Sequence, residues 1–243
     1  MIIDNHVHVG WFTDGYHTPQ EVWNSAMAAG IDGMAVSSTS TCAELYKNVV
    51  RELRELKRLG GERVRPILWL TPRMFKISYA LPYLLHSRIA WKGIKMHWEA
   101  HPEWSHNLRL VDKALDVARQ LNVPVLLHTG NFECCHAGIY KELIKSNPDL
   151  TFVLAHARPI NEALEVLSEC PNAYVDLAFV PFEAMKLIKE NKYANRTLFG
   201  TDMPINKVFF KDISTADFIK SHVEEVKRSF GNEAELILRS TTY

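Results

Sequence analysis

The sequence lacks an excess of either charge. Its 28 lysine and arginine residues are balanced by 28 aspartate and glutamate residues, so the formal net charge at pH 7 is +0. A general surface for nucleic acid or for anionic lipid needs an excess of basic residues. We therefore expect neither nucleic acid nor a membrane as a partner of this chain.

Membrane segments and a disulfide framework are missing as well. No apolar run approaches the roughly 18 residues of a membrane helix, and the chain begins with a strand pattern instead of the basic segment of a signal peptide. The four cysteines, Cys42, Cys134, Cys135 and Cys170, contain no CxxC pair. This usage is typical of a reducing compartment, so the sequence predicts a soluble cytoplasmic protein.

What the sequence does contain is a regular alternation of apolar, β-branched segments with amphipathic ones. Strands are predicted at residues 2–8, 32–37, 64–70, 93–97, 123–128, 151–156, 173–177 and 197–202. Helices are predicted at residues 19–29, 41–59, 77–89, 105–121, 137–146, 160–168, 182–191 and 215–230, with a short helix at 233–240. A strand followed by a helix is thus repeated eight times.

This repetition predicts an α/β protein with a parallel sheet. Eight such units in about 250 residues are the size of a (β/α)8 TIM barrel, so we expect a single domain over residues 1–243. An open doubly wound sheet is the alternative, because the sequence does not reveal whether the sheet closes. The lack of a glycine-rich phosphate loop after the first strand disfavours that alternative.

Polar side chains stand at the carboxyl ends of the predicted strands, where barrel enzymes build their active sites. His6 and His8 end the first strand, and a spacing of two residues puts both rings on one face. The later strand-end residues are Lys95, His97, His128, His156 and Asp202. Imidazole and carboxylate groups suit zinc and related metals, so we expect His128 and Asp202 to meet the histidine pair in a metal site. A hydrogen-bonded polar core is the alternative, and Asp4, one pleat deeper, is expected to orient a ligand imidazole.

Five segments at these strands resemble the amidohydrolase superfamily. They are "IIDNHVHVG", "GIKMH", "LLHTG", "FVLAHAR" and "LFGTDMP", which span residues 2 to 204 in order. Within the superfamily they are similar to the amidohydrolase-related branch, which includes decarboxylases related to aminocarboxymuconate-semialdehyde decarboxylase. The resemblance implies a TIM barrel of the metal-dependent hydrolase type.

The resemblance also implies roles for single residues. The implied metal ligands are His6, His8, His128 and Asp202. Asp202 would also take a proton from the metal-activated water, and His156 would either complete a second metal site or polarise the substrate. One divalent cation, Zn²⁺, is expected, with Mn²⁺, Fe²⁺ or a second metal as alternatives. Some relatives carry a carbamylated lysine near the position of Lys95, but we expect an ammonium there that binds a substrate carboxylate or pairs with an acid.

Four further residues are candidates for binding the substrate. His97 shares a strand face with Lys95 and is expected to line the pocket. Arg158 follows His156 and could hold a carboxylate with its planar guanidinium, although a solvated loop arginine is equally expected. Trp11 and Trp98 are expected to form aromatic walls of the pocket or to cap the hydrophobic core.

The sequence therefore predicts an enzyme, a metal-dependent hydrolase that uses a metal-activated water on a small, carboxylate-bearing substrate. A decarboxylase, and hence a lyase, on the same scaffold is the alternative. A TatD-like nuclease ranks third, because that family normally places a glutamate near Lys95 and the neutral charge offers no track for phosphates. A barrel that only stores a metal is the weakest hypothesis. The short loops also leave open a homodimer in which a neighbouring subunit completes the site.

Overall fold

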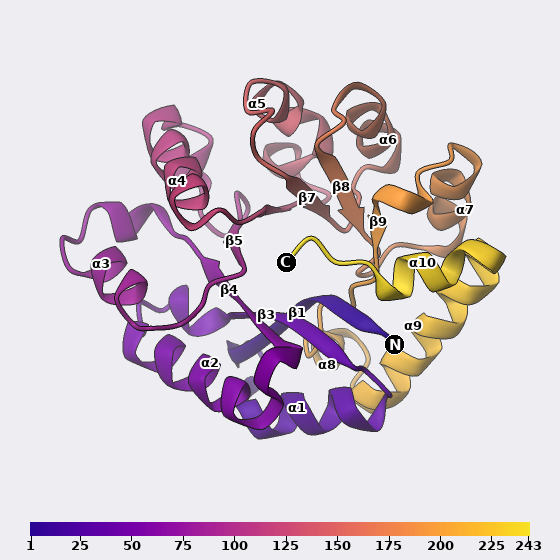
Figure 1. The fold of residues 1–243 in the computed structure, drawn as a ribbon, viewed down its shortest axis with the longest axis horizontal. Coiled ribbons are helices and arrows are strands. Elements are labelled where there is room, and N and C mark those ends of the chain that lie inside the picture. The colour runs from indigo at the N-terminus through magenta and orange to yellow at the C-terminus, as the bar shows by residue number, and fades with distance from the viewer.

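The computed structural model describes all 243 residues, and it shows an α/β protein built on one curled sheet (Figure 1). The sheet has nine strands in the order β2-β1-β3-β4-β5-β6-β7-β8-β9. The strands are β1 (Ile3–Phe12), β2 (Gly15–His17), β3 (Gly33–Ser38), β4 (Val64–Trp69), β5 (Gly93–Met96), β6 (Val125–His128), β7 (Phe152–Ala155), β8 (Ala173–Asp176) and β9 (Thr197–Leu198). Apart from β2, each strand runs parallel to its neighbours.

The helices form an outer layer around the strands, and the colours of Figure 1 follow each other around the ring in chain order. They are α1 (Pro19–Ala28), α2 (Tyr46–Gly60), α3 (Ala80–Leu85), α4 (Leu108–Leu121), α5 (Lys141–Lys145), α6 (Ile160–Glu169), α7 (Phe182–Glu190), α8 (Asn206–Phe209), α9 (Thr215–Phe230) and α10 (Ala234–Arg239). None of them is both long enough and apolar enough to cross a membrane.

Much of each strand is apolar because helices cover one face of the sheet and the other face lies inside the curl, and the polar strand residues such as His6 and Lys95 are buried there. All four residues of β7, for example, are buried. One cluster of 61 buried hydrophobic residues runs from Val7 in β1 to Leu238 in α10. The C-terminal segment turns into the centre of the ring, where the ring of Tyr243 lies against Gly93 (Figure 1).

The two ends of the curled sheet are joined by backbone hydrogen bonds. The N–H of His8 donates to the carbonyl oxygen of Met203 at 2.8 Å, and the N–H of Asp202 donates to that of His6 at 2.7 Å. Val7 and Met203 also form a parallel bridge. These bonds hold Asp202, which follows β9, directly beside the histidine pair of β1.

The eight predicted strands and their parallel order are confirmed, but several local features differ from the prediction. The helix expected at 41–59 begins only at Tyr46, and the helix expected at 77–89 is limited to Ala80–Leu85. β1 continues beyond residue 8 and pairs antiparallel with the short β2, with Gly10 opposite His17. α8 was not predicted, since it has only four residues and no periodicity to detect. The helix expected at 137–146 is shorter, because residues 137–140 form a 3-10 turn before α5 begins.

Candidate active site

β1 carries His6 and His8 into the interior of the curled sheet. Both rings are buried and lie on the same side of the strand, with their centroids 5.1 Å apart. The Nε2 atoms of the two rings lie 2.9 Å from the same atom, Nζ of Lys95 in β5. The alternation of side chains along a strand therefore produces the expected pair of converging imidazoles.

Hydrogen bonds on the far side of each ring fix its orientation. His6 Nδ1 lies 2.9 Å from Asp176 Oδ2, and His156 Nδ1 lies 2.9 Å from the carbonyl oxygen of Ala178. Carboxylate and carbonyl oxygens only accept hydrogen bonds, so in both rings Nδ1 carries the hydrogen and Nε2 keeps its lone pair. For His8 the same tautomer follows from Lys95, since an ammonium only donates. All three rings thus present Nε2 lone pairs.

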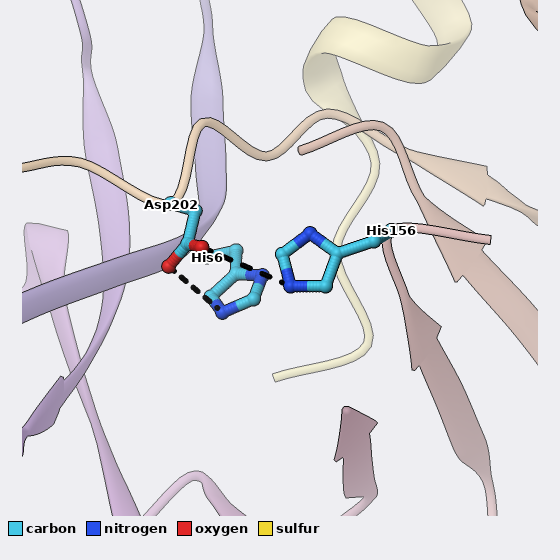
Figure 2. A group of neighbouring side chains, drawn as sticks. All are labelled: His6, His156 and Asp202. Carbon is cyan, nitrogen blue, oxygen red and sulfur yellow. Dashed lines mark ion pairs between the residues drawn. The ribbon is translucent and has the colours of Figure 1, made fainter. Parts of the chain in front are cut away.

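Asp202 faces these lone pairs. Its Oδ1 lies 3.0 Å from His8 Nε2 and 3.4 Å from His6 Nε2, and its Oδ2 lies 3.8 Å from His156 Nε2. Figure 2 shows the rings of His6 and His156 and the Asp202 carboxylate converging from three segments of the chain. Oδ1 is buried and accepts no hydrogen bond. Carboxylate oxygens and imidazole lone pairs repel each other unless a cation lies between them, so this donor set fits a divalent metal.

The charges of the site agree with this interpretation. Burial lowers the pKa of His8 and that of His156 to about 3, so both rings are neutral at pH 7, as metal ligands must be. Burial opposes ionisation of Asp202, yet the pKa of its carboxyl lies well below the usual value, and the carboxylate attracts the nearby Lys95 ammonium. Three neutral or anionic ligands are therefore available without a change of protonation.

Lys95 is the one cation within this group. It is buried, and its Nζ lies 4.6 Å from the centroid of the Trp69 ring. Burial lowers the pKa of Lys95 to about 8, against the attraction of Asp202 and Asp176. A metal bound to Nε2 of His6 and of His8 would replace the two hydrogen bonds that Lys95 donates to these atoms.

A cavity of about 610 Å³ opens beside Asp202 and His156. Its polar wall holds His97, Glu99, His128 and Arg158. The cavity is also lined by an aromatic wall, which we define as Phe179, Phe209 and Phe210. The rings of Phe179 and Phe210 are stacked, with centroids 6.5 Å apart. The cavity combines a cationic group, carboxylates and flat apolar surface at the edge of the candidate metal site.

The sequence of residues 87–228 matches the family model described as Amidohydrolase. The chain belongs to the amidohydrolase family. The resemblance noted from the five strand-end segments is thereby confirmed, and so is the prediction of an enzyme. No curated protein matches this amidohydrolase significantly.

Solved structures share its fold over nearly the whole chain. A probable 2-pyrone-4,6-dicarboxylic acid hydrolase from Acinetobacter baumannii is 16% identical, with a TM-score of 0.64, over 98% of this chain and 96% of its own. The 4-oxalomesaconate hydratase of Rhodopseudomonas palustris is 15% identical, with a TM-score of 0.67, over 98% and 93%. A 2,6-dihydroxybenzoate decarboxylase from Rhizobium is 14% identical, with a TM-score of 0.53, over 96% and 99%. At such identities the likeness concerns the fold alone.

The amidohydrolase brings the residues predicted for the metal site together at one cavity, where the ring of His128 lies 4.9 Å from the ring of His156 between centroids. Nε2 of His128 lies 3.2 Å from Glu99 Oε2, and its ring is stacked on His97 with centroids 3.6 Å apart. His156 instead of His128 shares a ligand cluster with His6 and Asp202. The assignment of His128 as a ligand of this cluster stays a prediction.

The predicted substrate-binding residues divide into two groups. His97 and Arg158 line the cavity, and Arg158 Nη2 donates to the carbonyl oxygen of Phe179 at 2.9 Å. Trp98 lies in the hydrophobic core against Tyr140. Trp11 is half exposed on the β1–β2 hairpin and does not line the cavity.

Two carboxylates of this site were not found by sequence reasoning. Asp176 ends β8, and its position at the end of an apolar strand was the available clue. Asp176 orients the imidazole of His6, which is the role expected of Asp4. Asp4 instead accepts hydrogen bonds from the hydroxyl of Thr201 at 2.6 Å and from the backbone N–H of His6 at 3.1 Å. Glu99 lies in the loop after β5, where no pattern distinguishes it from a solvated residue.

Proposed function

We propose that this amidohydrolase is a metal-dependent hydrolase that acts on a small, carboxylate-bearing substrate at the mouth of a single (β/α)8 barrel. The proposal rests on the convergence of three Nε2 lone pairs on the Asp202 carboxylate, with those of His6 and His8 on its unpartnered Oδ1 and that of His156 beside Oδ2. Backbone bonds between β1 and the segment after β9 support closure of the barrel at this point. The carboxyl ends of parallel strands are where such barrels perform their chemistry.

His6, His8 and Asp202 are the ligands that we propose, with His156 Nε2 in reach of the same group. Nitrogen and carboxylate donors favour Zn²⁺ among divalent cations. When bound, the cation would supply Lewis acidity, which lowers the pKa of water and polarises a substrate carbonyl. We propose one such cation in this group.

The protonation states assign roles to Asp202 and His156. Asp202 is ionised and buried, so its carboxylate can take a proton from water and later return it to a leaving group. His156 donates its single hydrogen to Ala178, so its Nε2 cannot donate to a substrate carbonyl. Of the two roles implied for His156, metal binding is therefore the one supported.

Arg158 is the proposed anchor for a substrate carboxylate. Arg158 lines the cavity, and its Nη2 donates to the carbonyl oxygen of Phe179, so the other N–H groups of the guanidinium are available to a ligand. Bidentate pairing of arginine with carboxylate is strong and directional. The names of two structural neighbours, a dicarboxylic acid hydrolase and a benzoate decarboxylase, agree with an acid as substrate.

Decarboxylation is a second candidate, and the aromatic wall is the observation that favours it. The stacked rings of Phe179 and Phe210 suit a planar, unsaturated or aromatic acid better than a flexible one. Both reactions are tested by incubating the zinc-loaded enzyme with carboxylated lactones, amides and benzoates in ¹⁸O-labelled water. Label in the organic product supports hydrolysis, and release of carbon dioxide with an unlabelled organic product contradicts it.

A further inference from the structure

A buried carboxylate outside the metal site holds the loop that follows β3. Glu52 belongs to α2 in the outer helix layer, and its side chain is fully buried (Figure 1). It accepts hydrogen bonds from three hydroxyl groups, those of Tyr16 at 3.0 Å, Ser38 at 2.5 Å and Ser40 at 2.8 Å. We infer that Glu52 is a positioning residue, which holds His8 in the orientation that binds the metal. The inference rests on the function proposed above.

The end of β3 connects Glu52 to His8. Ser37 and Ser38 are neighbours in this strand, so their side chains point to opposite faces of the sheet. Ser38 points to the helix layer and donates to Glu52, whereas Ser37 points into the curl, where its Oγ lies 2.8 Å from His8 Nδ1. Loss of the contact with Glu52 would therefore release the strand end that bears Ser37.

The contact with Ser37 keeps the ring of His8 in the form that a metal requires. Lys95 donates to Nε2 of His8, so Nδ1 carries the hydrogen and donates it to the hydroxyl oxygen of Ser37. The register of β1 and β3 places His8 and Ser37 opposite each other. A metal bound to Nε2 needs the same tautomer, so this hydrogen bond orients the ring with and without a cation.

The loop after β3 also holds the backbone of β1 close to the metal site. Thr39 Oγ1 donates to the carbonyl oxygen of Val9 at 3.1 Å. Gly10 has φ = +110°, and a β-carbon on it would lie 2.9 Å from Thr39 Oγ1 and 3.0 Å from Ser40 Oγ. The two hydroxyl groups thus pack directly against the backbone of β1, and Glu52 holds the second of them.

Tyr16 brings the β1–β2 hairpin into the same network. It lies in β2, which pairs with the end of β1. Phe12 on that end of β1 has its ring centroid 6.1 Å from that of His8. Through its three hydrogen bonds, Glu52 therefore joins the hairpin, the loop after β3 and α2 around one proposed metal ligand.

Packing of α2 alone does not explain a carboxylate at this position. Val49, Leu53 and Leu56 are among the other buried residues of the helix, and all three are apolar. A buried carboxylate is costly unless hydrogen bonds satisfy it, and the three hydroxyl groups do so for Glu52. Conversely, an apolar residue in its place would leave buried hydroxyl groups without their acceptor. We therefore expect removal of Glu52 to disturb the loop more than the helix.

The zinc affinity of Glu52→Ala, measured by competition with a chromophoric chelator, tests the inference. We expect a loss of roughly tenfold or more, as is common when the partners of metal ligands are removed. Leu56→Ala is the matched control, because it removes a fully buried apolar side chain from the same helix. It should lower the melting temperature and leave the zinc affinity unchanged. Wild-type affinity in Glu52→Ala, or an equal loss in Leu56→Ala, would overturn the inference.

Ser38→Ala is a milder variant that remains informative if Glu52→Ala does not fold. It removes only one of the three donors, so we expect a loss of zinc affinity of several-fold, and wild-type affinity would count against the inference. Failure of the proposed function gives a different result, since the wild type itself would then bind no zinc, and the inference would fall with it.

A double-mutant cycle with Ser37→Ala tests the route to His8. If Glu52 acts on His8 through the end of β3, Glu52→Ala should reduce the zinc affinity much less in the Ser37→Ala background than in the wild type. Strictly additive losses would contradict this route. The melting temperature of each variant, measured without metal, separates these effects from general destabilisation.

Discussion

His6 Nδ1 donates a hydrogen bond of 2.9 Å to Asp176 Oδ2, and both side chains are buried. The other carboxylate oxygen of Asp176 accepts hydrogen bonds of 3.0 Å from the backbone N–H groups of His156 and Ala178. One carboxylate thus orients a proposed ligand on β1 and fixes the backbone of a second on the segment after β7. It links the two sides of the candidate metal site.

The first prediction concerns this link. Asp176→Asn replaces one carboxylate oxygen with an NH₂ group, which donates hydrogen bonds and accepts none. One of the three N–H groups that now donate to Asp176 then loses its acceptor inside the protein, at a cost of about 1–3 kcal/mol. We expect a lower melting temperature and a metal affinity reduced roughly 10–100-fold, because His6 loses its fixed tautomer. Metal affinity and thermal unfolding are to be compared with Asp112→Asn, an exposed residue. Wild-type affinity in Asp176→Asn would show that His6 needs no such orientation.

The second prediction concerns removal of the metal. A cation that binds only the folded protein stabilises it, by about 2.7 kcal/mol at a hundredfold excess over its dissociation constant. A chelator should therefore lower the melting temperature of the wild type, and added Zn²⁺ should restore it. In Asp202→Asn, which lacks the anionic oxygen facing His6 and His8, the chelator should have a much smaller effect. Equal shifts in both proteins would place the stabilising metal elsewhere.

The third prediction concerns substrate binding. Arg158→Lys keeps the charge but removes the planar pair of donors, and a hydrogen bond to a charged group contributes about 1.5–3 kcal/mol. We expect KM for a carboxylate substrate to rise roughly ten- to hundredfold while kcat changes little. The matched substrate is its neutral methyl ester, whose KM should not respond to the substitution. An unchanged KM for the acid would exclude Arg158 as the anchor.

The fourth prediction concerns pH and the neighbouring cysteines. Burial raises the pKa of the Cys135 thiol to about 12, with Glu99 adding to the shift. The thiolate that reacts with iodoacetamide is therefore scarce at pH 8 and increases only as the pH rises toward that value. In metal-free protein, mass spectrometry should find alkylation of the exposed Cys134 and little of the buried Cys135. Equal labelling of both at pH 8 would contradict the burial of Cys135.

Much of the architecture could be predicted because strand and helix periodicities are local. The spacing of His6 and His8 fixes a shared face in any strand, and the position of Asp202 after the last strand brings it to the same edge. Closure of the sheet depends on twist and register, which no local pattern records. The structure reveals the bonds from Asp202 and Met203 to β1 that join its ends.

The partners of the histidines could not be predicted from the sequence. Asp4 and Asp176 both stand on strands, and which carboxylate reaches the His6 ring depends on register and on the irregularity of β1 between Asp4 and Val7. Glu99 reaches His128, the last residue of β6, from the loop that follows the neighbouring strand β5. Side-chain direction in loops is a tertiary property that periodicity does not report.

The zinc content of the purified wild type and of Asp202→Asn tests the central claim most directly. After dialysis the wild type should retain about one zinc ion per chain, bound in a four-ligand site. Asp202→Asn, which lacks the anionic oxygen facing His6 and His8, should retain almost none. Equal zinc in the two proteins, or none in a zinc-replete preparation of the wild type, would contradict a metal centre at His6, His8 and Asp202.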